Sequence, residues 1–304
     1  MIIINQNYGQ LCNQLFLYAH LAAYAIEKKR TLYYPGFAKN FSYFPNLKKP
    51  GQGKILFGNR CPRWFNSFSY FFYRRFFYSN SKPTRWIESL LKIKIHFKMD
   101  PLQETFYPDI DRINLPQGIC FFEGWAFRMH ETFQKHSKHL RNLFELDEYY
   151  TKKASEFVRK LHGGLKIGIH IRLGDYKEEA KQWVFPMEFW KRLMQNIRQE
   201  TGNIATFILV SDDPEINFNE NWIIRHRGDR FEDLSLLAAC DLVVGPPSTF
   251  NRWAAFSGCK PHFCTWEDKN FPHINDFKIF KLCSEKKLAL NDADLNGVRW
   301  CGIA

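Results

Sequence analysis

The sequence predicts an α/β fold built on parallel sheets, and three observations support that prediction. The chain of 304 residues is longer than one hydrophobic core usually organises, which favours two domains. Short apolar strands alternate with helices from Leu165 to Cys264, as in a parallel sheet that helices cover on both faces. The chain also begins with a strand, a polar loop and a helix in that order, so we expect a second sheet near the N-terminus.

The elements of the N-terminal half follow from apolar runs and helical spacing. Met1 to Ile4 is a short apolar run that predicts a buried strand, and residues 13–25 carry apolar side chains at helical spacing. Prolines and glycines make residues 31–60 rich in loops. Further along, we expect a strand at residues 119–122 and helices at residues 128–146 and 147–160.

The C-terminal half alternates more regularly. Apolar runs predict strands at residues 165–171, 205–210, 222–224, 241–244 and 260–264, and the periodicity predicts helices at residues 187–200, 231–240 and 249–257. A turn at residues 162–164 marks the change in character. We therefore expect an N-terminal domain at residues 1–155 and a C-terminal domain at residues 156–304.

Residues 60–98 form an insertion that combines basic and aromatic side chains. The chain has a net charge of +12, and a basic protein attracts nucleic acid, anionic membrane surfaces or phosphate-bearing small molecules. Interleaved aromatic and basic residues are typical of an interfacial membrane anchor. The alternative for this insertion is a helical subdomain whose aromatic rings pack inward while its basic groups stay in water.

Cysteine spacing and hydropathy indicate a cytoplasmic protein with reduced thiols. The eight cysteines include no C-x-x-C pair and lie beside no pair of histidines at zinc-finger spacing. We see no signal peptide and no apolar run long enough to span a membrane. The acidic strings at 109–111 and 292–294 follow no buried strand, and residues 211–213 form a turn closed by Pro214. We therefore expect no required metal and no other cofactor.

Three polar segments follow predicted parallel strands, where ligands bind in open α/β sheets. They are residues 170–176, 211–213 and 245–251. Ser248 and Thr249 begin a predicted helix, whose unpaired N–H groups and dipole favour an anion. Arg172 ends a neighbouring strand and has the fork geometry that holds phosphate oxygens. Together they predict a pyrophosphate site; the alternative is that Ser248 only caps its helix and Arg172 only pairs with Asp175.

Several blocks, in the same order along the chain, resemble those of the α-1,2-fucosyltransferases, glycosyltransferase family 11. Residues 9–16 resemble its N-terminal G-x-L-G-N-Q-apolar-F block, and residues 123–127 its glycine–aromatic segment. Residues 169–176 resemble its H-x-R-R-G-D-Y signature, and the last blocks correspond to residues 211–213 and 247–255. The resemblance implies a GT-B fold of two Rossmann-like domains that face each other across a donor cleft. The C-terminal domain would bind a GDP-sugar, and the N-terminal domain would be on the acceptor side.

The resemblance also implies residues that bind the donor, each by its place in a matching block. Arg172 corresponds to an arginine on the donor phosphates. His170 and Asp233 correspond to positions that hold the guanine. The loop whose amides reach the β-phosphate corresponds to Ser248, Thr249 and Phe250, and the N-terminal asparagine that faces the donor corresponds to Asn13.

The implied reaction is the inverting, metal-independent transfer of L-fucose from GDP-fucose to a hydroxyl group of a glycan in α-1,2 linkage. Arg172 would stabilise the negative charge that develops on the departing diphosphate. Asp175 and Glu178 are the nearest carboxylates that would take the proton of the acceptor hydroxyl. The expected acceptor is a glycan or a lipid-linked oligosaccharide of polysaccharide biosynthesis, which would place the enzyme peripherally on an anionic inner membrane face.

Two positions depart from the family's pattern. Leu173 stands where the family has arginine, and Cys12 stands where it has glycine. The missing charge leaves another GDP-sugar open as the donor. A noncatalytic nucleotide- or sugar-binding protein is a second alternative, and a nucleic-acid-binding protein that uses residues 60–98 is a third. The third leaves residues 170–176 and 248–251 without a role, so we expect no nucleic-acid partner.

Overall fold

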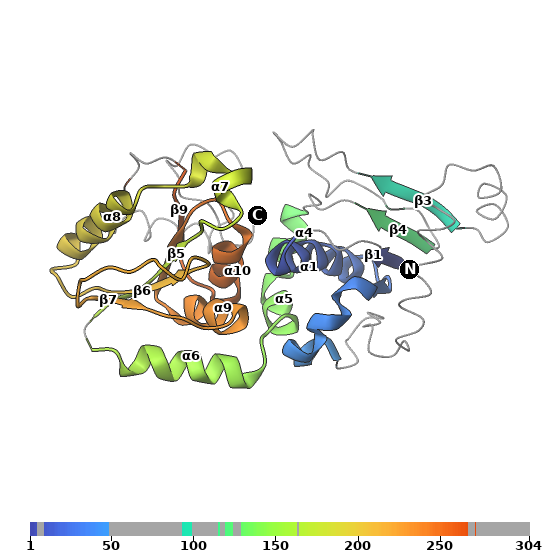
Figure 1. Cartoon of the computed structure of the whole chain (residues 1–304). Helices are drawn as coiled ribbons and strands as arrows, with labels where there is room; N and C mark the ends of the chain where they lie inside the picture. Colours follow the sequence, from blue (N-terminus) through green and yellow to red (C-terminus); the bar gives the residue numbers. More distant parts are fainter. Residues whose placement is uncertain are drawn as a thin grey trace. The chain divides into compact units, whose positions relative to one another are not determined.

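The structure, a computed structural model, describes residues 1–4, 9–48, 93–98, 115, 119–123, 129–162, 164–266 and 271. It divides into an N-terminal unit, Met1–Glu145, and a C-terminal unit, Leu146–Ala304 (Figure 1). Each unit contains one parallel sheet. The boundary predicted after residue 155 lies inside helix α6 (Glu148–Lys160), and the structure assigns the whole helix to the C-terminal unit.

The N-terminal unit is built on a four-stranded parallel sheet in the order β2-β1-β4-β3. Helix α1 connects β1 to β2 and is buried on almost every side, since most of its side chains are apolar. The bounds are β1 Ile2–Ile4, α1 Leu11–Glu27, β2 Leu32–Tyr33, β3 Ile93–Lys98 and β4 Ile119–Glu123. Two 3-10 helices, Pro35–Tyr43 and Pro45–Lys48, occupy the start of the stretch predicted to be rich in loops.

The helix predicted at residues 128–146 is two helices, α4 (His130–Lys135) and α5 (Ser137–Leu143). His136 separates them with φ −99° and ψ 7°, outside the helical range. Lys135 and His136 both contact the carboxylate of Glu27 in α1 at 2.7 Å. A tertiary contact with α1 therefore accompanies the break, and the periodicity of residues 128–146 could not predict that contact.

Strand β3 lies within the basic and aromatic insertion predicted at residues 60–98. Its residues Ile93–Lys98 pair in parallel with β4, so this end of the insertion belongs to the sheet and is not helical. Residues 60–92 lie outside the described residues, as do both acidic strings, 109–111 and 292–294. The choice between a membrane anchor and a helical subdomain therefore stays a prediction.

The C-terminal unit is built on a five-stranded parallel sheet in the order β7-β6-β5-β8-β9. The strands are β5 Lys166–Ile171, β6 Thr206–Ser211, β7 Ile223–Arg225, β8 Leu242–Gly245 and β9 His262–Cys264. The helices are α6, α7 Tyr176–Glu179, α8 Met187–Glu200, α9 Arg230–Ala239 and α10 Thr249–Gly258, with a 3-10 helix at Lys181–Trp183. The predicted alternation of strands and helices is confirmed; the short helix α7 was not predicted.

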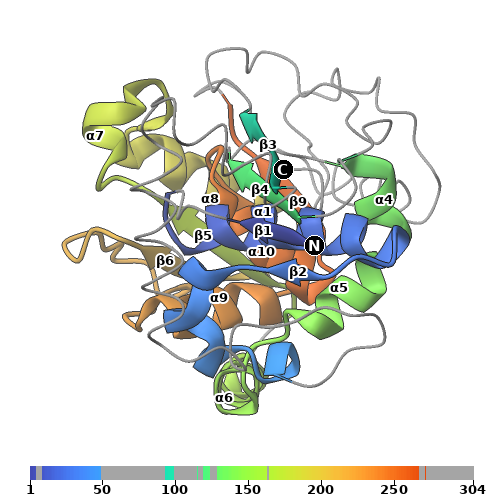
Figure 2. The same ribbon diagram turned by 90° about the vertical axis from the view of Figure 1, so that its right-hand side faces the viewer.

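Helices cover both faces of this sheet, as the apolar strands require. On one face, Trp190 and Leu193 of α8 pack in a core with Ile167 and Ile169 of β5. On the other face, Leu236 of α9 and Ala154 of α6 pack with Ile208 of β6, and α6 lies alongside α9 (Figure 1, Figure 2). Asp147 caps α6 by accepting a hydrogen bond from the Tyr149 N–H at 3.0 Å.

The strand order sets the place where a ligand would bind. From β5 the chain adds β6 and then β7 on one side, and later adds β8 and β9 on the other side. The order therefore reverses between β5 and β8. Ligands of open α/β sheets bind outside the carboxyl ends of the strands at such a switch point.

Candidate functional site

Two predicted polar segments meet at the switch point of the C-terminal sheet. One follows β5 and contains Arg172 to Tyr176; the other joins β8 to α10. The Tyr176 hydroxyl donates a hydrogen bond of 2.6 Å to the carbonyl oxygen of Pro247. The ring of His170, at the end of β5, lies 5.1 Å from the ring of Phe250. The structure therefore brings together the segments from which a pyrophosphate site was predicted.

Arg172 is held in a fixed orientation beside this contact. Its Nε and Nη2 atoms donate hydrogen bonds to the two carboxylate oxygens of Asp175, at 2.9 and 2.6 Å. Its guanidinium carbon lies 5.2 Å from the centre of the Tyr176 ring. Burial acts against its charge, but the carboxylate of Asp175, together with Asp212 and Tyr176, outweighs burial and raises the pKa of Arg172. Its third nitrogen, Nη1, has no hydrogen-bond partner in the described part of the chain, so one donor edge is open to a ligand.

The two carboxylates predicted as proton acceptors differ in their surroundings. Both oxygens of Asp175 accept hydrogen bonds from Arg172, which gives Asp175 the geometry of a residue that positions the guanidinium. Glu178 lies in α7 and is exposed. Its carboxylate makes no hydrogen bond or ion pair with any residue that the structure describes. Glu178 is therefore the carboxylate of the two that can receive a proton without giving up a partner.

Helix α10 begins at the predicted anion-binding loop. Ser248 is its N-cap, and its hydroxyl oxygen accepts a hydrogen bond of 3.3 Å from the Phe250 N–H. Asn251 is fully buried, and its side-chain amide donates to the carbonyl oxygen of Pro246 at 2.8 Å. A Cβ atom on Gly245 would lie 1.9 Å from that amide nitrogen, so only glycine leaves room for this contact. The loop between β8 and α10, with half-buried Thr249, is thus tied to the helix it precedes.

The alternative considered for these residues is also present in the structure, since Ser248 caps α10 and Arg172 pairs with Asp175. The two interpretations are compatible. A capping hydroxyl leaves other N–H groups of the first turn for an anion. The open Nη1 edge of Arg172 likewise leaves one donor for a phosphate oxygen.

His170 is a neutral, buried residue. Its side chain is 3% exposed and its Nδ1 atom has no hydrogen-bond partner among the described residues. Burial, followed by the charges of Arg172 and His262, lowers the pKa of His170 to about 3. His170 therefore contributes no positive charge near neutral pH and acts only through its ring and its nitrogen atoms.

Acidification should destabilise the folded protein through His170. Histidine in the unfolded chain titrates near pH 6.5, whereas the folded ring stays neutral down to about pH 3. Between these values the unfolded state binds one proton more, so stability falls by about 1.4 kcal/mol for each unit of decreasing pH. His170→Leu removes this contribution. Between pH 6.5 and 5, the free energy of unfolding should fall by about 2 kcal/mol less in the variant, measured with urea. Parallel pH profiles for the two proteins would contradict the assignment.

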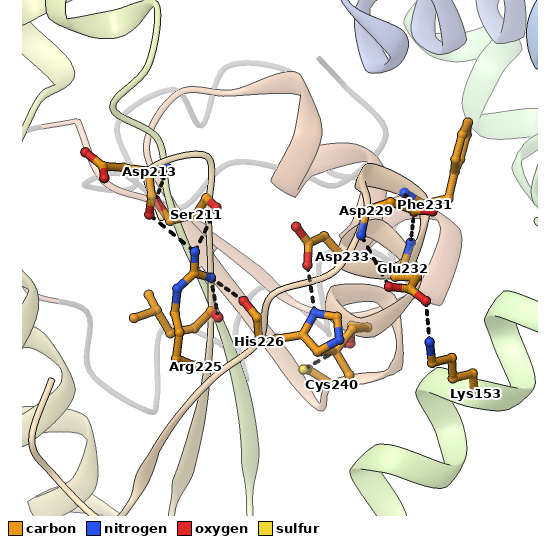
Figure 3. A network of polar contacts seen from close by, with 12 residues as sticks. Lys153, Ser211, Asp213, Arg225, His226, Asp229, Phe231, Glu232, Asp233 and Cys240 are labelled. Carbon is orange, nitrogen blue, oxygen red and sulfur yellow. Dashed lines mark hydrogen bonds and ion pairs between the residues drawn. The ribbon is translucent and has the colours of Figure 1, made fainter. Parts of the chain in front are cut away.

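Asp233 lies in the first turn of α9, at the same edge of the sheet but next to β7. Its carboxylate contacts Nδ1 of His226 at 2.7 Å (Figure 3). Burial raises the pKa of Asp233, against the opposing effect of His226. Asp229 caps α9 and forms a reciprocal capping box with Glu232, which fixes the turn that carries Asp233.

Arg225 and His226 were not predicted as site residues. The guanidinium of Arg225 donates to the carbonyl oxygens of Leu209 at 3.1 Å and Ser211 at 3.0 Å, and also to that of His226 (Figure 3). It thereby ties the ends of β6 and β7 together. Both residues directly follow the strand predicted at residues 222–224, so the rule of polar residues after parallel strands would have found them.

The segment Ser211–Asp213 has the geometry of a turn, as predicted. Ser211 Oγ accepts from the Asp213 N–H at 3.1 Å, and Asp212 accepts from the Leu173 N–H at 2.8 Å. Asp213 pairs with Lys177 at 3.1 Å. Within the described ranges, no group of three or more histidine, cysteine or acidic side chains is placed to hold a metal ion.

Asn13 lies in the N-terminal unit, in the first turn of α1. Its side chain covers Gly9, where a Cβ atom would lie 2.2 Å from the amide nitrogen of Asn13. Gly9 has φ +58°, a conformation that favours glycine. None of the helices in the described residues combines the length and apolar character needed to cross a membrane.

Comparison with known families places more than half of the chain in one of them. The sequence model of glycosyl transferase family 11 matches residues 89–273. That range contains every predicted site residue except Asn13. No curated protein sequence compared with the chain gives a match.

Several solved fucosyltransferase structures are similar to the chain in fold. The structure of NodZ α-1,6-fucosyltransferase soaked with GDP-fucose covers 86% of this chain and 94% of its own, at 13% identity and a TM-score of 0.50. Arabidopsis thaliana FUT1, as a point mutant in complex with GDP, covers 88% of this chain and 71% of its own, at 14% identity and a TM-score of 0.52. Fucosyltransferase NodZ from Bradyrhizobium covers 86% and 94%, at 14% identity and a TM-score of 0.51. The predicted α/β, GT-B-like fold class is confirmed.

Proposed function

Because this chain belongs to glycosyl transferase family 11 and is a glycosyltransferase, we propose that it transfers L-fucose from GDP-fucose to a hydroxyl group of a glycan. The proposed reaction is inverting, needs no metal and forms an α-1,2 linkage. The donor is supported by the family and by the NodZ structure soaked with GDP-fucose. The linkage rests on the resemblance alone, since NodZ is an α-1,6-fucosyltransferase.

One observation supports the donor site most directly, namely the meeting of Arg172 with the start of α10 at the switch point. The Arg172 guanidinium lies over the ring of Tyr176. The Tyr176 hydroxyl donates a hydrogen bond to the carbonyl oxygen of Pro247, one residue before the N-cap of α10. A guanidinium and the N-terminal N–H groups of a helix are both suited to phosphate oxygens. We propose that the diphosphate of the donor binds between them and that the guanine lies toward Asp233 and His170.

The chain's residues would act on the bond between the sugar and the diphosphate. As the bond from the anomeric carbon to the β-phosphate oxygen breaks, its electron pair stays on GDP and negative charge grows there. Fixed donors stabilise that charge most in the transition state, because they need no reorganisation. The acceptor oxygen attacks the anomeric carbon from the opposite face and gives its proton to a carboxylate. We propose Glu178 for this role, and Asp175 as the residue that holds Arg172 in place.

The remaining partners are inferred from the class of reaction. We propose that the N-terminal unit, which contains Asn13, provides the acceptor site, as the resemblance implies. A lipid-linked oligosaccharide acceptor would account for the basic and aromatic residues at 60–98, by bringing a cytoplasmic enzyme to an anionic membrane surface. No role for nucleic acid is proposed.

A panel of nucleotide sugars tests the donor. A ligand that binds only the native state raises stability by about 2.7 kcal/mol at one hundred times its dissociation constant. We expect GDP-fucose to raise the unfolding temperature, and the UDP- and CDP-sugars to leave it unchanged. Turnover of GDP-fucose with a glycan acceptor should proceed fully in EDTA.

Each other outcome of this panel selects a different function. Turnover of another GDP-sugar instead of GDP-fucose would replace the proposed donor. Binding without turnover of any sugar nucleotide would favour a noncatalytic protein, and salt-sensitive retention of DNA alone would favour a nucleic-acid-binding one. Activity that EDTA abolishes and Mn²⁺ restores would overturn the metal-free mechanism.

A further inference from the structure

Arg252 is a buried cation that no acidic side chain balances in the described part of the chain. It lies in α10 and is 8% exposed. Its Nη2 atom lies 3.6 Å from the sulfur of Cys264, its guanidinium lies 5.7 Å from the centre of the Trp266 ring, and its Nε has no hydrogen-bond partner. Burying a charge without an ionic partner costs several kcal/mol. Such a group is therefore expected where an anion binds.

The position of Arg252 points to the loop between β8 and α10. Cys264, which its guanidinium contacts, is the register partner of Gly245, and the Thr265 N–H donates to the Gly245 carbonyl oxygen at 2.9 Å. Gly245 directly precedes the loop that ends at Ser248. Side chains on a helix also incline toward its N-terminus, which here is the same loop. Arg252 thus lies beside the proposed diphosphate site, on the β9 side.

An aromatic row connects Arg252 to Arg172. The Trp266 ring, on which Arg252 lies, is 5.8 Å from Trp183, and Trp183 is 5.9 Å from Tyr176. The guanidinium of Arg172 in turn lies over the Tyr176 ring. Burial raises the pKa of Tyr176, and the charges of Arg172 and Arg252 both oppose that rise, so both act on the same phenol. The two guanidiniums therefore border one region at the carboxyl edge of the sheet.

Charge balance indicates what Arg252 would do there. The charge of Arg172 is already matched by Asp175, His170 is neutral near pH 7, and Leu173 is apolar. A nucleoside diphosphate brings several negative charges, while a helix N-terminus contributes only about half a positive charge. We propose that Arg252 supplies the unmatched positive charge that binds the terminal phosphate of the nucleoside diphosphate. This inference rests on the proposed function.

Binding of GDP and GMP to the purified full-length chain tests the proposal, because the two differ by the terminal phosphate. Calorimetry should show wild-type protein binding GDP more tightly than GMP. Arg252→Met should weaken GDP binding at least tenfold and change GMP binding less than twofold. Arg252→Lys should retain part of the preference for GDP. The unfolding temperature of Arg252→Met without ligand should equal or exceed that of wild type, since an unpaired buried charge has been removed.

Two variants complete the test. Arg252→Gln is a second neutral variant with the same expected result, should Arg252→Met not fold. Arg198→Met is the matched control, because the guanidinium of Arg198 also lies on a tryptophan ring, 5.2 Å from the centre of Trp222. Arg198 donates to the carbonyl oxygen of Ala205, just before the amino end of β6, and so lies at the edge of the sheet opposite the proposed site. Its nucleotide binding should stay at the wild-type value.

The outcomes separate this inference from the proposed function. Wild-type protein that binds neither nucleotide would overturn both. Wild-type protein that binds GDP, with neutral Arg252 variants that bind it equally well, would overturn only the role of Arg252. Equal weakening of GDP and GMP, together with a lower unfolding temperature, would show that Arg252 merely supports Trp266 and would also overturn it.

Discussion

Replacing Arg172 with alanine should lower the turnover of GDP-fucose about a thousandfold while changing the unfolding temperature little. Loss of one fixed donor to a developing oxyanion reduces turnover by about 10²–10³, and Arg172 would bring both a donor and a charge. Its side chain is 13% exposed and that of Asp175 is 33% exposed, so the carboxylate left behind still reaches water. Steady-state kinetics and a thermal melt of the same preparations check both parts. Wild-type turnover in Arg172→Ala would rule out its assignment to the donor phosphates.

Two further variants separate the charge of Arg172 from its geometry. Arg172→Lys keeps the charge but cannot donate to both oxygens of Asp175 in the present way, so we expect turnover between those of wild type and alanine. Asp175→Asn removes the charged partner but leaves a side chain of the same shape. If Asp175 only positions Arg172, this variant should lose less turnover than Arg172→Ala and should keep the same pH profile. Loss of the acidic limb of the pH–rate profile in Asp175→Asn, where activity falls as the base is protonated, would instead identify Asp175 as the proton acceptor.

The features of the site that could be predicted from sequence are those with local causes. Ser248 and Thr249 were recognisable because a serine before an apolar helical stretch is a capping signal, and α10 begins at Thr249 as predicted. Arg172 was recognisable because it follows a short run of buried residues, which forms β5. In both cases the element and its end depend on a few neighbouring residues, and the topology of a parallel sheet then brings the ends together.

The features that could not be predicted depend on distant contacts. The bidentate geometry between Arg172 and Asp175 was only one of two alternatives, and its compatibility with an open Nη1 edge required coordinates. The assignment of α6 to the C-terminal unit depends on contacts with residues far along the chain, among them the packing of Ala154 with Leu236 and the pairing of Lys153 with Glu232. Periodicity predicted a helix there but contained no information on which sheet it would cover.

The burial of Arg252 is another feature that the sequence alone could not predict. In the sequence it is one arginine in a predicted helix, and solvent exposure is the usual expectation for that residue type. Only the fold shows that it is buried between Cys264 and Trp266. A buried polar residue is more informative than an exposed one, because its cost needs a compensating interaction.

Gly258→Ala should be among the most destabilising single substitutions in the C-terminal unit. Gly258 is the last residue of α10, and a Cβ atom there would lie 2.1 Å from the carbonyl oxygen of Ala238 in α9. A main-chain atom cannot rotate away, so the two helices must move apart. Overpacking of this kind costs about 3 kcal/mol. We expect a correspondingly lower urea midpoint, and weaker GDP binding by the folded fraction, because α9 and α10 carry Asp233 and Ser248 at their starts.

The control for this prediction is Gly202→Ala, where no atom lies within 4 Å of the added Cβ. Gly202 has φ +66°, so alanine there pays only the cost of a left-handed backbone, about 1–2 kcal/mol. It lies in the turn between α8 and β6, remote in sequence from both helices. Gly202→Ala should therefore lower the midpoint less than Gly258→Ala and leave GDP affinity unchanged. Equal stability losses, or a Gly258→Ala protein with the wild-type midpoint, would mean that α9 and α10 do not need this close contact to place the two ends of the proposed donor site.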